Sequence, residues 1–179
     1  VWLLTGSVIL EVFQEALADQ PLPLDMRTAE IVVIPKSGLP PERCESYQPI
    51  LLLNVEMKIW AKTLAERLYP MMASLVHPDQ AGFMPGRSNR HNIRRVQDAL
   101  ALAQLHSGDR ILMAVDFQKA FDSGDWSYRF SLLEKMNFGP KFIKYFGLLY
   151  KDLFAHVRIG SAVPGTLQVR RGTSQGCPV

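Results

Sequence analysis

A short apolar run in the middle of the chain ends abruptly on a carboxylate, and this places the strongest constraint on the fold. The residues from Ile111 to Val115 are all apolar, and Asp116 follows directly. Such a run is typical of a buried strand, and an ionised carboxylate is too costly to leave in a core. We therefore expect Asp116 at the open end of a central strand, where it would bind a metal ion and take part in catalysis.

The length and charge of the chain leave several classes of protein open. Its 179 residues are 47% hydrophobic and 21% charged, which suits one globular domain or a piece of a larger one. A net charge of +3 permits a polyanionic partner without demanding one. The chain starts at Val1 without an initiator methionine and ends at Val179. We expect it to be a fragment.

The cysteines and the length of the apolar runs bear on location. Cys44 and Cys177 are far apart and show no paired-thiol spacing, which favours neither a disulfide framework nor a zinc site. We therefore expect a reducing, intracellular setting, in the nucleus or the cytoplasm. No apolar stretch reaches about eighteen residues and no basic-then-apolar leader opens the chain, so we expect no membrane partner.

Hydrophobic periodicity predicts an α+β fold that is rich in helices and has a few antiparallel strands. We see no repeat or compositional break that would separate two domains. The loop over 77–87 contains two prolines and two glycines, which indicates a shaped connection. The predicted elements are helices over 8–17, 59–75, 93–103, 126–136 and 142–150, a strand over 29–34, and a hairpin over 155–159 and 167–169.

The acidic residues nearest to Asp116 have two interpretations. A two-metal site for phosphoryl or nucleotidyl transfer needs two or three carboxylates, and Asp116 supplies only one. Asp122 and Asp125 follow within ten residues. Both also suit turn or capping roles, because aspartate bonds readily to nearby backbone amides, and for Asp125 the helix cap is the favoured interpretation.

Basic residues gather on a loop and at the start of a helix. Lys36 follows a predicted strand, where it can offer a charge to a triphosphate, although a lone loop lysine is more often plain surface. Arg87, Arg90 and Arg94 open the helix that follows the loop. Clustered guanidinium groups suit a nucleic-acid backbone, and an ordinary basic helix face explains them equally well.

The predicted hairpin carries a second basic group. Arg158 and Arg170 alternate with apolar residues, so they belong to its polar face. That face can line a nucleic-acid groove, or it can be the solvated side of a half-buried sheet. The sequence alone leaves both interpretations open.

The chain carries short motifs in a fixed order, at 34–36, 47–54, 77–83, 85–87, 116–122 and 172–178. Together they resemble the reverse transcriptase domain of non-LTR (LINE-type) retrotransposons. The resemblance covers nearly the whole chain, from about Pro21 to its end. It implies a partial right-hand polymerase fold in one incomplete domain, with about 1–110 mainly fingers and about 111–179 the first part of the palm.

The resemblance gives Asp116 and its neighbours specific roles. Asp116 is similar to the first metal-binding aspartate of the palm, with the Phe117 carbonyl expected beside the same Mg²⁺ and next to the nucleotide. Phe121 resembles the aromatic gate that crowds a ribose 2′-hydroxyl and so favours dNTPs. The implied reaction adds a dNTP to a DNA primer 3′-hydroxyl on an RNA template.

Three further positions match parts of the family's nucleotide site. Lys36 matches the fingers lysine that neutralises the triphosphate. Gln175 and Gly176 resemble the glutamine-glycine pair that borders the incoming nucleotide. The basic helix after Arg87 would lie near the template or primer backbone.

The chain also departs from the family pattern. Gln48 stands where the family has an arginine before Pro-Ile, so we expect weaker nucleotide binding. Gly124 replaces a usual apolar residue, which we expect to loosen the start of the next helix. The family's second aspartate motif, the thumb and the primer grip would lie beyond Val179. A degenerate or co-opted remnant that at most binds nucleic acid is therefore the alternative to a polymerase.

Overall fold

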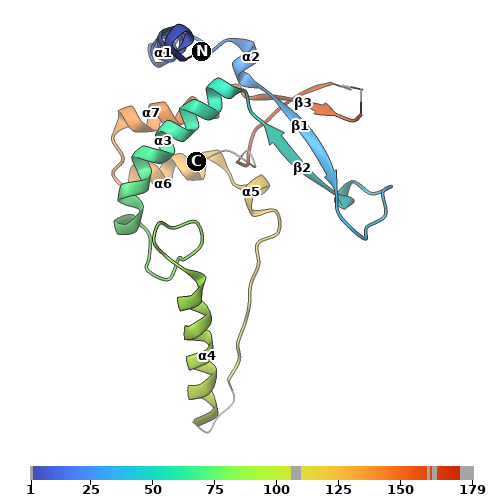
Figure 1. Cartoon of the computed structure of the whole chain (residues 1–179), viewed down its shortest axis with the longest axis vertical. Helices are drawn as coiled ribbons and strands as arrows, with labels where there is room; N and C mark the ends of the chain where they lie inside the picture. Colours follow the sequence, from blue (N-terminus) through green and yellow to red (C-terminus); the bar gives the residue numbers. More distant parts are fainter. Residues whose placement is uncertain (1, 106–109, 161, 163–164, 174–179) are drawn as a thin grey trace. The chain divides into compact units, whose positions relative to one another are not determined.

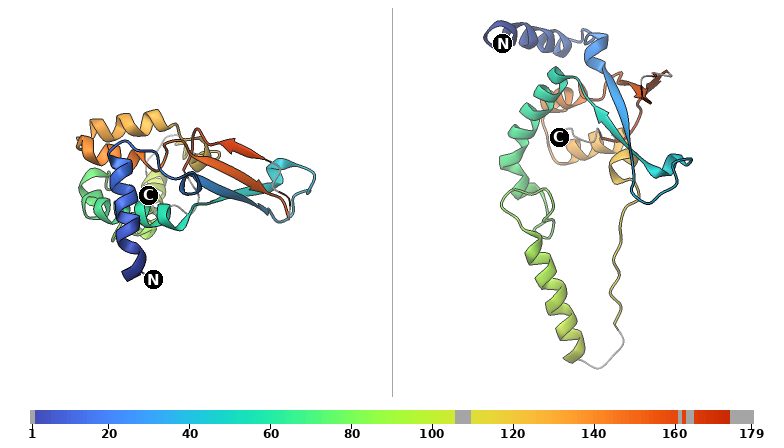
Figure 2. Two further views of the ribbon diagram at one scale, coloured as in Figure 1. Left: turned by 90° about the horizontal axis from the view of Figure 1, so that it is seen from above. Right: turned by 45° about the vertical axis from the view of Figure 1, so that its right-hand side comes forward.

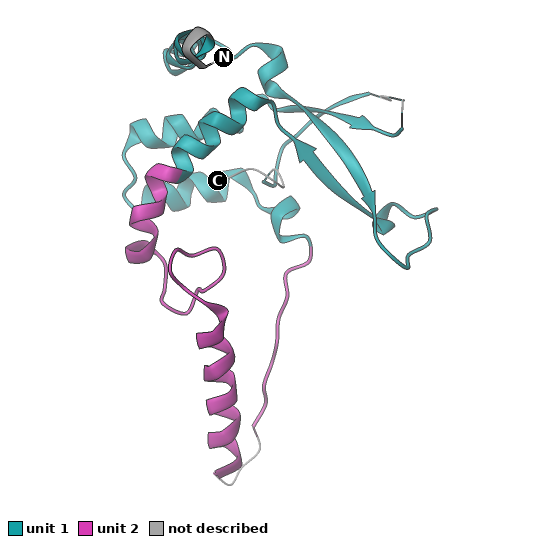
Figure 3. Ribbon diagram, viewed as in Figure 1, with its two compact units in different colours: residues 1–65, 119–179 teal, residues 66–118 magenta. Residues whose placement is uncertain are grey.

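The computed structural model describes residues 2–105, 110–160, 162 and 165–173. It divides the chain into two compact units, which are coloured separately in Figure 3. Unit 1 contains residues 1–65 and 119–179, and unit 2 contains residues 66–118. The elements are α1 (Trp2–Leu17), α2 (Leu24–Arg27), β1 (Thr28–Pro35), η1 (Cys44–Ser46), β2 (Tyr47–Leu52), α3 (Val55–Leu75), α4 (Asn89–Leu105), α5 (Ala120–Ser123), α6 (Trp126–Lys135), α7 (Pro140–Gly147), β3 (Phe154–Arg158) and β4 (Thr166–Gln168).

The α+β prediction is confirmed, and its strands form one sheet in unit 1. The strand order is β2-β1-β3-β4, with β1 and β3 in the middle, as Figure 1 shows for β1, β2 and β3. The β3–β4 pair is antiparallel, as the predicted hairpin requires. The strand β2 was not among the predicted elements; it pairs antiparallel with β1, whereas β1 and β3 run parallel. The sheet is therefore mixed, because the long helical connection between β1 and β3 lets the chain return in the same direction.

A mainly aliphatic and aromatic core holds the helices of unit 1 together. Phe13 of α1 stacks on Trp60 of α3 with ring centroids 4.5 Å apart, and the Trp60 Nε1–H donates to the Tyr145 carbonyl of α7 at 3.0 Å. Phe130 of α6 meets Phe146 of α7 edge to face at 6.0 Å, and the two helices lie side by side in Figure 2. Buried aromatic rings of this size contribute much of the apolar area of a small core.

Most predicted helices are present, with small shifts at their ends. The helix predicted over 142–150 is α7, which starts at Pro140 and ends at Gly147. Leu148, Leu149 and Tyr150 follow it as buried core residues outside the helix. A proline at the first helical position is favourable, since its missing amide would have no partner there.

Unit 2 contains the end of α3, the loop 77–87 and α4. The loop is a shaped connection, as predicted, and its side chains Ala81 and Met84 are buried. The helix α4 has no buried residue among those described. Its apolar stripe was predicted correctly as a helical pattern, but the stripe remains exposed in this structure.

The prediction of a buried strand before Asp116 is wrong for this structure. Residues 110–118 belong to no strand or helix, and Ile111 is 95% exposed. An apolar run becomes a buried strand only where a neighbouring strand and a packing surface cover it, and the described residues pair no strand with this run. The apolar sequence of this run therefore did not predict its environment, because the run is neither paired as a strand nor buried.

Candidate nucleotide and nucleic-acid site

The hairpin of β1 and β2 places Lys36 at its tip. The Lys36 amide donates to the Ser46 carbonyl at 2.7 Å, and its Nζ donates to the Glu45 carbonyl at 3.0 Å. The Tyr47 hydroxyl donates to the Pro41 carbonyl at 3.0 Å, which closes the same loop. An ammonium group has three donors, so a closed loop of this kind can still present a charge to a phosphate.

Gln48 lies in the same hairpin, on the strand that returns from the loop. It pairs with Ile34 in the β1–β2 register, one position before the pairing of Pro35 with Tyr47. Its side chain is exposed. Lys36 and Gln48 therefore lie at the same end of one hairpin.

Asp116 and Phe117 lie in unit 2, on the extended segment that precedes α5. Both residues are exposed, and Phe117 is 80% exposed. A carboxylate and a backbone carbonyl are oxygen donors of the kind that Mg²⁺ prefers. Among the residues that the structure describes, no group of three acidic, histidine or cysteine side chains could hold a metal ion. Lys36 and Phe121 belong to unit 1, so their convergence with Asp116 stays a prediction.

Phe121 lies on the short helix α5, which follows a tight backbone turn. Lys119 has a φ of 51°, and the amides of Asp122 and Ser123 both donate to its carbonyl at 3.0 Å. The Phe121 side chain is 54% exposed. The backbone at Phe121 is therefore held by hydrogen bonds, while its side chain stays largely exposed.

The beginning of the motif at 172–178 is bonded to this same turn. The Thr173 amide donates to the Phe121 carbonyl at 2.7 Å, and the Gly172 amide donates to the Gly124 carbonyl at 2.8 Å. We call these two backbone contacts the junction. They bring together two motifs that are about fifty residues apart in sequence. Gln175 and Gly176, which the resemblance predicts to border the nucleotide, lie outside the described residues.

Glycine is required at position 172 for two separate reasons. Its φ is +87°, a conformation that other L-residues rarely adopt. A Cβ atom there would also lie 2.8 Å from the Asp122 carbonyl oxygen and 3.0 Å from that of Phe121. The close approach of the two backbones therefore depends on this glycine.

Two side chains of α6 secure the junction, and sequence reasoning did not find them as site residues. The Trp126 Nε1–H donates to the Gly172 carbonyl at 2.8 Å. Arg129 donates from Nη1 to the same carbonyl at 3.0 Å and from Nη2 to the Thr173 hydroxyl at 3.3 Å. No local sequence pattern predicts these contacts, because the partners are more than forty residues away along the chain.

An open pocket of about 210 Å³ lies beside the junction in unit 1. Ile31, Leu51 and Leu167 of the sheet contribute apolar lining, and Tyr150 and Val169 extend it. Its polar lining comes from Asp122, Arg171 and Thr173. An apolar surface with a few converging polar groups is the usual composition of a small-molecule site.

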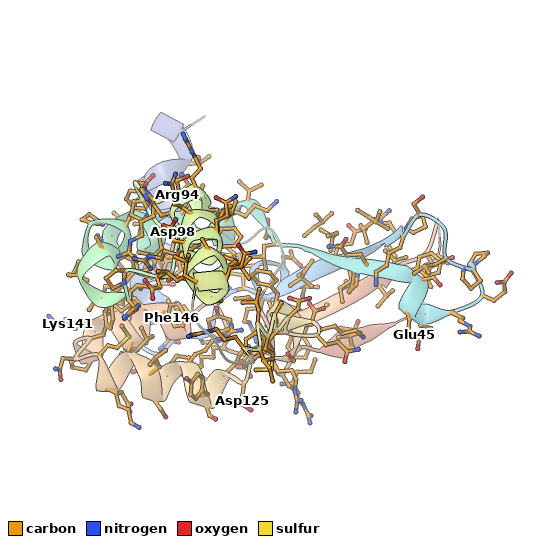
Figure 4. All side chains as sticks on the ribbon, turned by 90° about the horizontal axis from the view of Figure 1, so that it is seen from below. Glu45, Arg94, Asp98, Asp125, Lys141 and Phe146 are labelled. Atoms are coloured by element: carbon orange, nitrogen blue, oxygen red, sulfur yellow. The ribbon has the colours of Figure 1, made fainter. Side chains whose placement is uncertain are left out.

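Asp125 has the capping role that sequence reasoning favoured. Its side chain accepts hydrogen bonds from the amides of Ser127 at 2.7 Å and Tyr128 at 3.4 Å, and from the Ser127 hydroxyl. These bonds lower the pKa of the Asp125 carboxyl, first of all the one from the Ser127 hydroxyl. The helix α6 therefore has a defined start despite the neighbouring Gly124. Figure 4 labels Asp125.

The guanidinium of Arg87 is bonded within its own unit. It donates to the carbonyls of Ala73, Val76, His77 and Gln80 at distances between 2.6 and 3.1 Å. The Ala73 carbonyl belongs to the last turn of α3, the Val76 carbonyl directly follows the helix, and the other two belong to the loop. Arg87 therefore closes the C-terminal end of α3 and fixes the loop, a role that sequence reasoning missed. Its contact with nucleic acid stays a prediction.

The other arginines of this group lie on α4 and are exposed. Arg94 bonds to Asp98 one turn further along at 3.3 Å, and Figure 4 labels both residues. Arg95 forms an ion pair with Asp79 of the loop. Arg90, Arg94 and His91 line an open hollow of about 620 Å³ on this helix. A basic face remains available on α4.

The polar face of the sheet is more neutral than the sequence suggested. Arg158 of β3 forms an ion pair with Glu30 of β1. His156 and Thr166 face each other with Nδ1 and Oγ1 3.0 Å apart. Arg170 donates to the Gln168 side chain at 3.2 Å. The parallel β1–β3 pairing is what brings Glu30 beside these residues, and it could not be seen in the hairpin alone.

None of the helices in the described part of the chain is both long enough and apolar enough to cross a membrane.

Comparison with known proteins agrees with the arrangement of motifs. Residues 34–179 match the family model of the reverse transcriptase (RNA-dependent DNA polymerase). The chain belongs to the reverse transcriptase family, and its mixed sheet with surrounding helices is part of that polymerase fold.

Two proteins that the chain is similar to come from transposons. The chain is 32% identical over 178 residues to the "Transposon TX1 uncharacterized 149 kDa protein" of Xenopus laevis, covering 99% of this chain and 14% of that protein. It is 30% identical over 172 residues to the "Probable RNA-directed DNA polymerase from transposon BS" of Drosophila melanogaster, covering 92% of this chain and 18% of that protein. The chain thus spans less than a fifth of either relative, and the resemblance to a non-LTR retrotransposon reverse transcriptase is confirmed.

Proposed function

We propose that this chain supplies the fingers and the first part of the palm of an RNA-directed DNA polymerase. Residues of about 1–110 would be mainly fingers, and about 111–179 would begin the palm. The junction carries the proposal, because the 2.7 Å bond from the Thr173 amide to the Phe121 carbonyl unites two polymerase motifs. In the complete enzyme the primer 3′-hydroxyl would attack the α-phosphate of a dNTP paired to template RNA.

Asp116 and the Phe117 carbonyl are the groups that would hold Mg²⁺. Both are oxygen donors on an exposed segment, which fits a metal that keeps water and substrate phosphate among its ligands. When bound, the metal would neutralise charge on the reacting phosphates. One carboxylate and one carbonyl are only part of a ligand set, so further carboxylates would come from elsewhere in the full-length protein.

Lys36 and Phe121 would act on the incoming nucleotide. The Lys36 ammonium, on a loop closed by its own bonds, would face the triphosphate. Phe121, fixed through its backbone at the junction, would limit the space beside the sugar. Gln175 and Gly176 follow the junction in sequence and would border the same nucleotide.

The exposed arginines would contact the template and primer backbone. Arg90 and Arg94 on α4 offer charge without deep burial. Arg158 on β3 and Arg170, which follows β4, are engaged with Glu30 and Gln168, so they would exchange these partners for phosphate. Arg87 would contribute through the loop that it holds.

Single-nucleotide addition by the full-length protein tests the proposal. With an RNA template, a DNA primer and Mg²⁺, the protein should extend the primer. Asp116→Asn should reduce the rate by at least about a thousandfold, because an amide replaces a charged metal ligand. As a control, Glu134→Gln also replaces an exposed carboxylate by an amide, on α6, and it should leave the rate unchanged. Extension that is equally fast in the Asp116→Asn protein would refute the assignment.

The alternative is a co-opted remnant that binds nucleic acid without chemistry, and Gln48 in place of the family arginine favours it. Such a protein would bind a primer-template with salt-sensitive affinity. It would add no nucleotide in Mg²⁺, even at high dNTP concentration. The same extension assay therefore separates the two functions.

A further inference from the structure

We propose that Arg129 is a positioning residue that holds the Phe121 gate in place through the junction. The absence of a side chain at Gly124 leaves the space that the Arg129 guanidinium occupies. The inference rests on the proposed function for its effect on nucleotide choice. The pairing of Arg129 with Gly124 rests on the structure alone. Neither residue belongs to a motif that the sequence marks as functional.

Arg129 has the geometry of a two-point clamp. Its Nη1 donates to the Gly172 carbonyl and its Nη2 donates to the Thr173 hydroxyl, at 3.0 and 3.3 Å. The guanidinium carbon also lies 5.8 Å from the centre of the Tyr150 ring, which is buried. A planar fork can reach two acceptors at once, which the single ammonium of lysine does far less well.

The clamp acts on the residue that holds Phe121. The Thr173 amide donates to the Phe121 carbonyl at 2.7 Å, and the Thr173 hydroxyl lies 3.4 Å from that same oxygen. Because the Phe121 ring is 54% exposed, packing alone does not fix it. A gate must be held within a fraction of an ångström to discriminate by shape. Arg129 therefore reaches the gate through Thr173 without touching the nucleotide.

The side chain of Arg129, and not the backbone conformation at position 124, accounts for a glycine at this position. Its φ of −61° and ψ of 123° are open to any L-residue, so conformation does not require glycine. A Cβ atom at position 124 would overlap Nη2 of Arg129. A side chain there would displace the flexible end of Arg129 from the position in which it bonds to the Gly172 carbonyl and the Thr173 hydroxyl. The glycine that departs from the family pattern and the arginine therefore form one unit.

The test is a double-mutant cycle on nucleotide discrimination in the full-length protein. The measured quantity is the ratio of kcat/KM for a dNTP to that for the matching ribonucleotide. Arg129→Leu should lower this ratio about tenfold, because the loss of a hydrogen bond to a charged group costs about enough free energy for a tenfold change in rate. Gly124→Ala should lower it similarly. The double variant should be no worse than either single variant, because both remove the same contacts.

Two controls separate positioning from folding. Gly139→Ala adds a Cβ where no atom lies within 4 Å, so it should leave the ratio unchanged. Arg129→Lys keeps the charge but not the fork, so it should fall between Leu and the parent protein. A ratio that stays constant in Arg129→Leu, even with a lower melting temperature, would overturn the positioning role. Additive losses in the double variant would overturn the pairing with Gly124.

Amide hydrogen exchange tests the clamp without reference to activity. Arg129→Leu should speed exchange of the Gly172 and Thr173 amides at least about tenfold, because both bonds of the junction lose their support. Unchanged exchange would overturn the clamp. A parent protein that copies no RNA would overturn the proposed function and the gating step with it, whereas faster exchange in the variant would still support the clamp.

Discussion

Two segments that the sequence marks as parts of one active site have opposite environments in this structure. Ile111–Phe117 is the more hydrophobic, yet its side chains are exposed. The turn at 121–124 is richer in polar groups, yet its backbone accepts hydrogen bonds from Gly172 and Thr173, and Arg129 donates to these same two residues. Apolar residues are buried only where a surface covers them, whereas the turn has hydrogen-bond partners elsewhere in unit 1. Hydrophobicity alone therefore does not tell which part of a site is built.

The largest expected effect comes from breaking the junction itself. Gly172→Ala should destabilise unit 1 by about 2–4 kcal/mol, because the new methyl group meets two carbonyl oxygens and the backbone has a φ of +87°. Chemical denaturation followed by tryptophan fluorescence measures it. Gly165→Ala, with no atom near the added Cβ, is the matched control. Equal stability of the two variants would show that the junction contributes nothing.

The next effect concerns the hydrogen bonds by which Arg87 holds the loop 77–87 of unit 2. Arg87→Met should destabilise the loop 77–87 by about 2 kcal/mol, since four carbonyls lose a charged donor. Limited proteolysis and hydrogen exchange of the loop measure this change. Arg90→Met, on the exposed face of α4, should leave the loop unaffected. If both variants are cut equally fast, Arg87 is not what fixes the loop.

A smaller effect concerns the hairpin that carries Lys36. Gln48→Arg should lower the KM for dNTP about fivefold to tenfold, because a guanidinium adds both a charge and a second donor for phosphate. Steady-state extension on an RNA template measures the constant. Gln14→Arg on the exposed face of α1 adds the same charge elsewhere and serves as the control. An unchanged KM in Gln48→Arg would contradict the placement of the triphosphate at this hairpin.

The smallest effect is the pH dependence of the α6 cap. Because hydrogen bonds lower the folded-state pKa of Asp125, the cap stabilises the helix fully above the ordinary aspartate pKa of about 3.9. That stabilisation is lost as the pH falls through the lower, folded-state pKa. Asp125→Asn keeps an acceptor oxygen but should remove this part of the acid sensitivity. Denaturation curves at about pH 7 and about pH 3 compare the two proteins. The same pH dependence in both would argue against the cap.

The sequence predicted local features well and distant contacts poorly. The cap at Asp125 and the β-branched strand before Pro35 follow from neighbouring residues, so pattern reasoning found them. The buried strand before Asp116 was wrong because a hydrophobic run does not reveal whether a partner covers it. Arg87 and Arg129 were missed as structural residues because their acceptors lie far along the chain or in an irregular loop. The parallel pairing of β1 with β3 was missed for the same reason.

The central claim is that the backbone at Thr173 is bonded to Phe121, so that two polymerase motifs meet. A scalar coupling across that hydrogen bond, between the Thr173 amide nitrogen and the Phe121 carbonyl carbon, tests it directly in isotopically labelled protein. The 2.7 Å contact predicts a measurable coupling. A Thr173 amide that shows no coupling to Phe121 and exchanges with solvent at the rate of an unfolded chain would contradict the account.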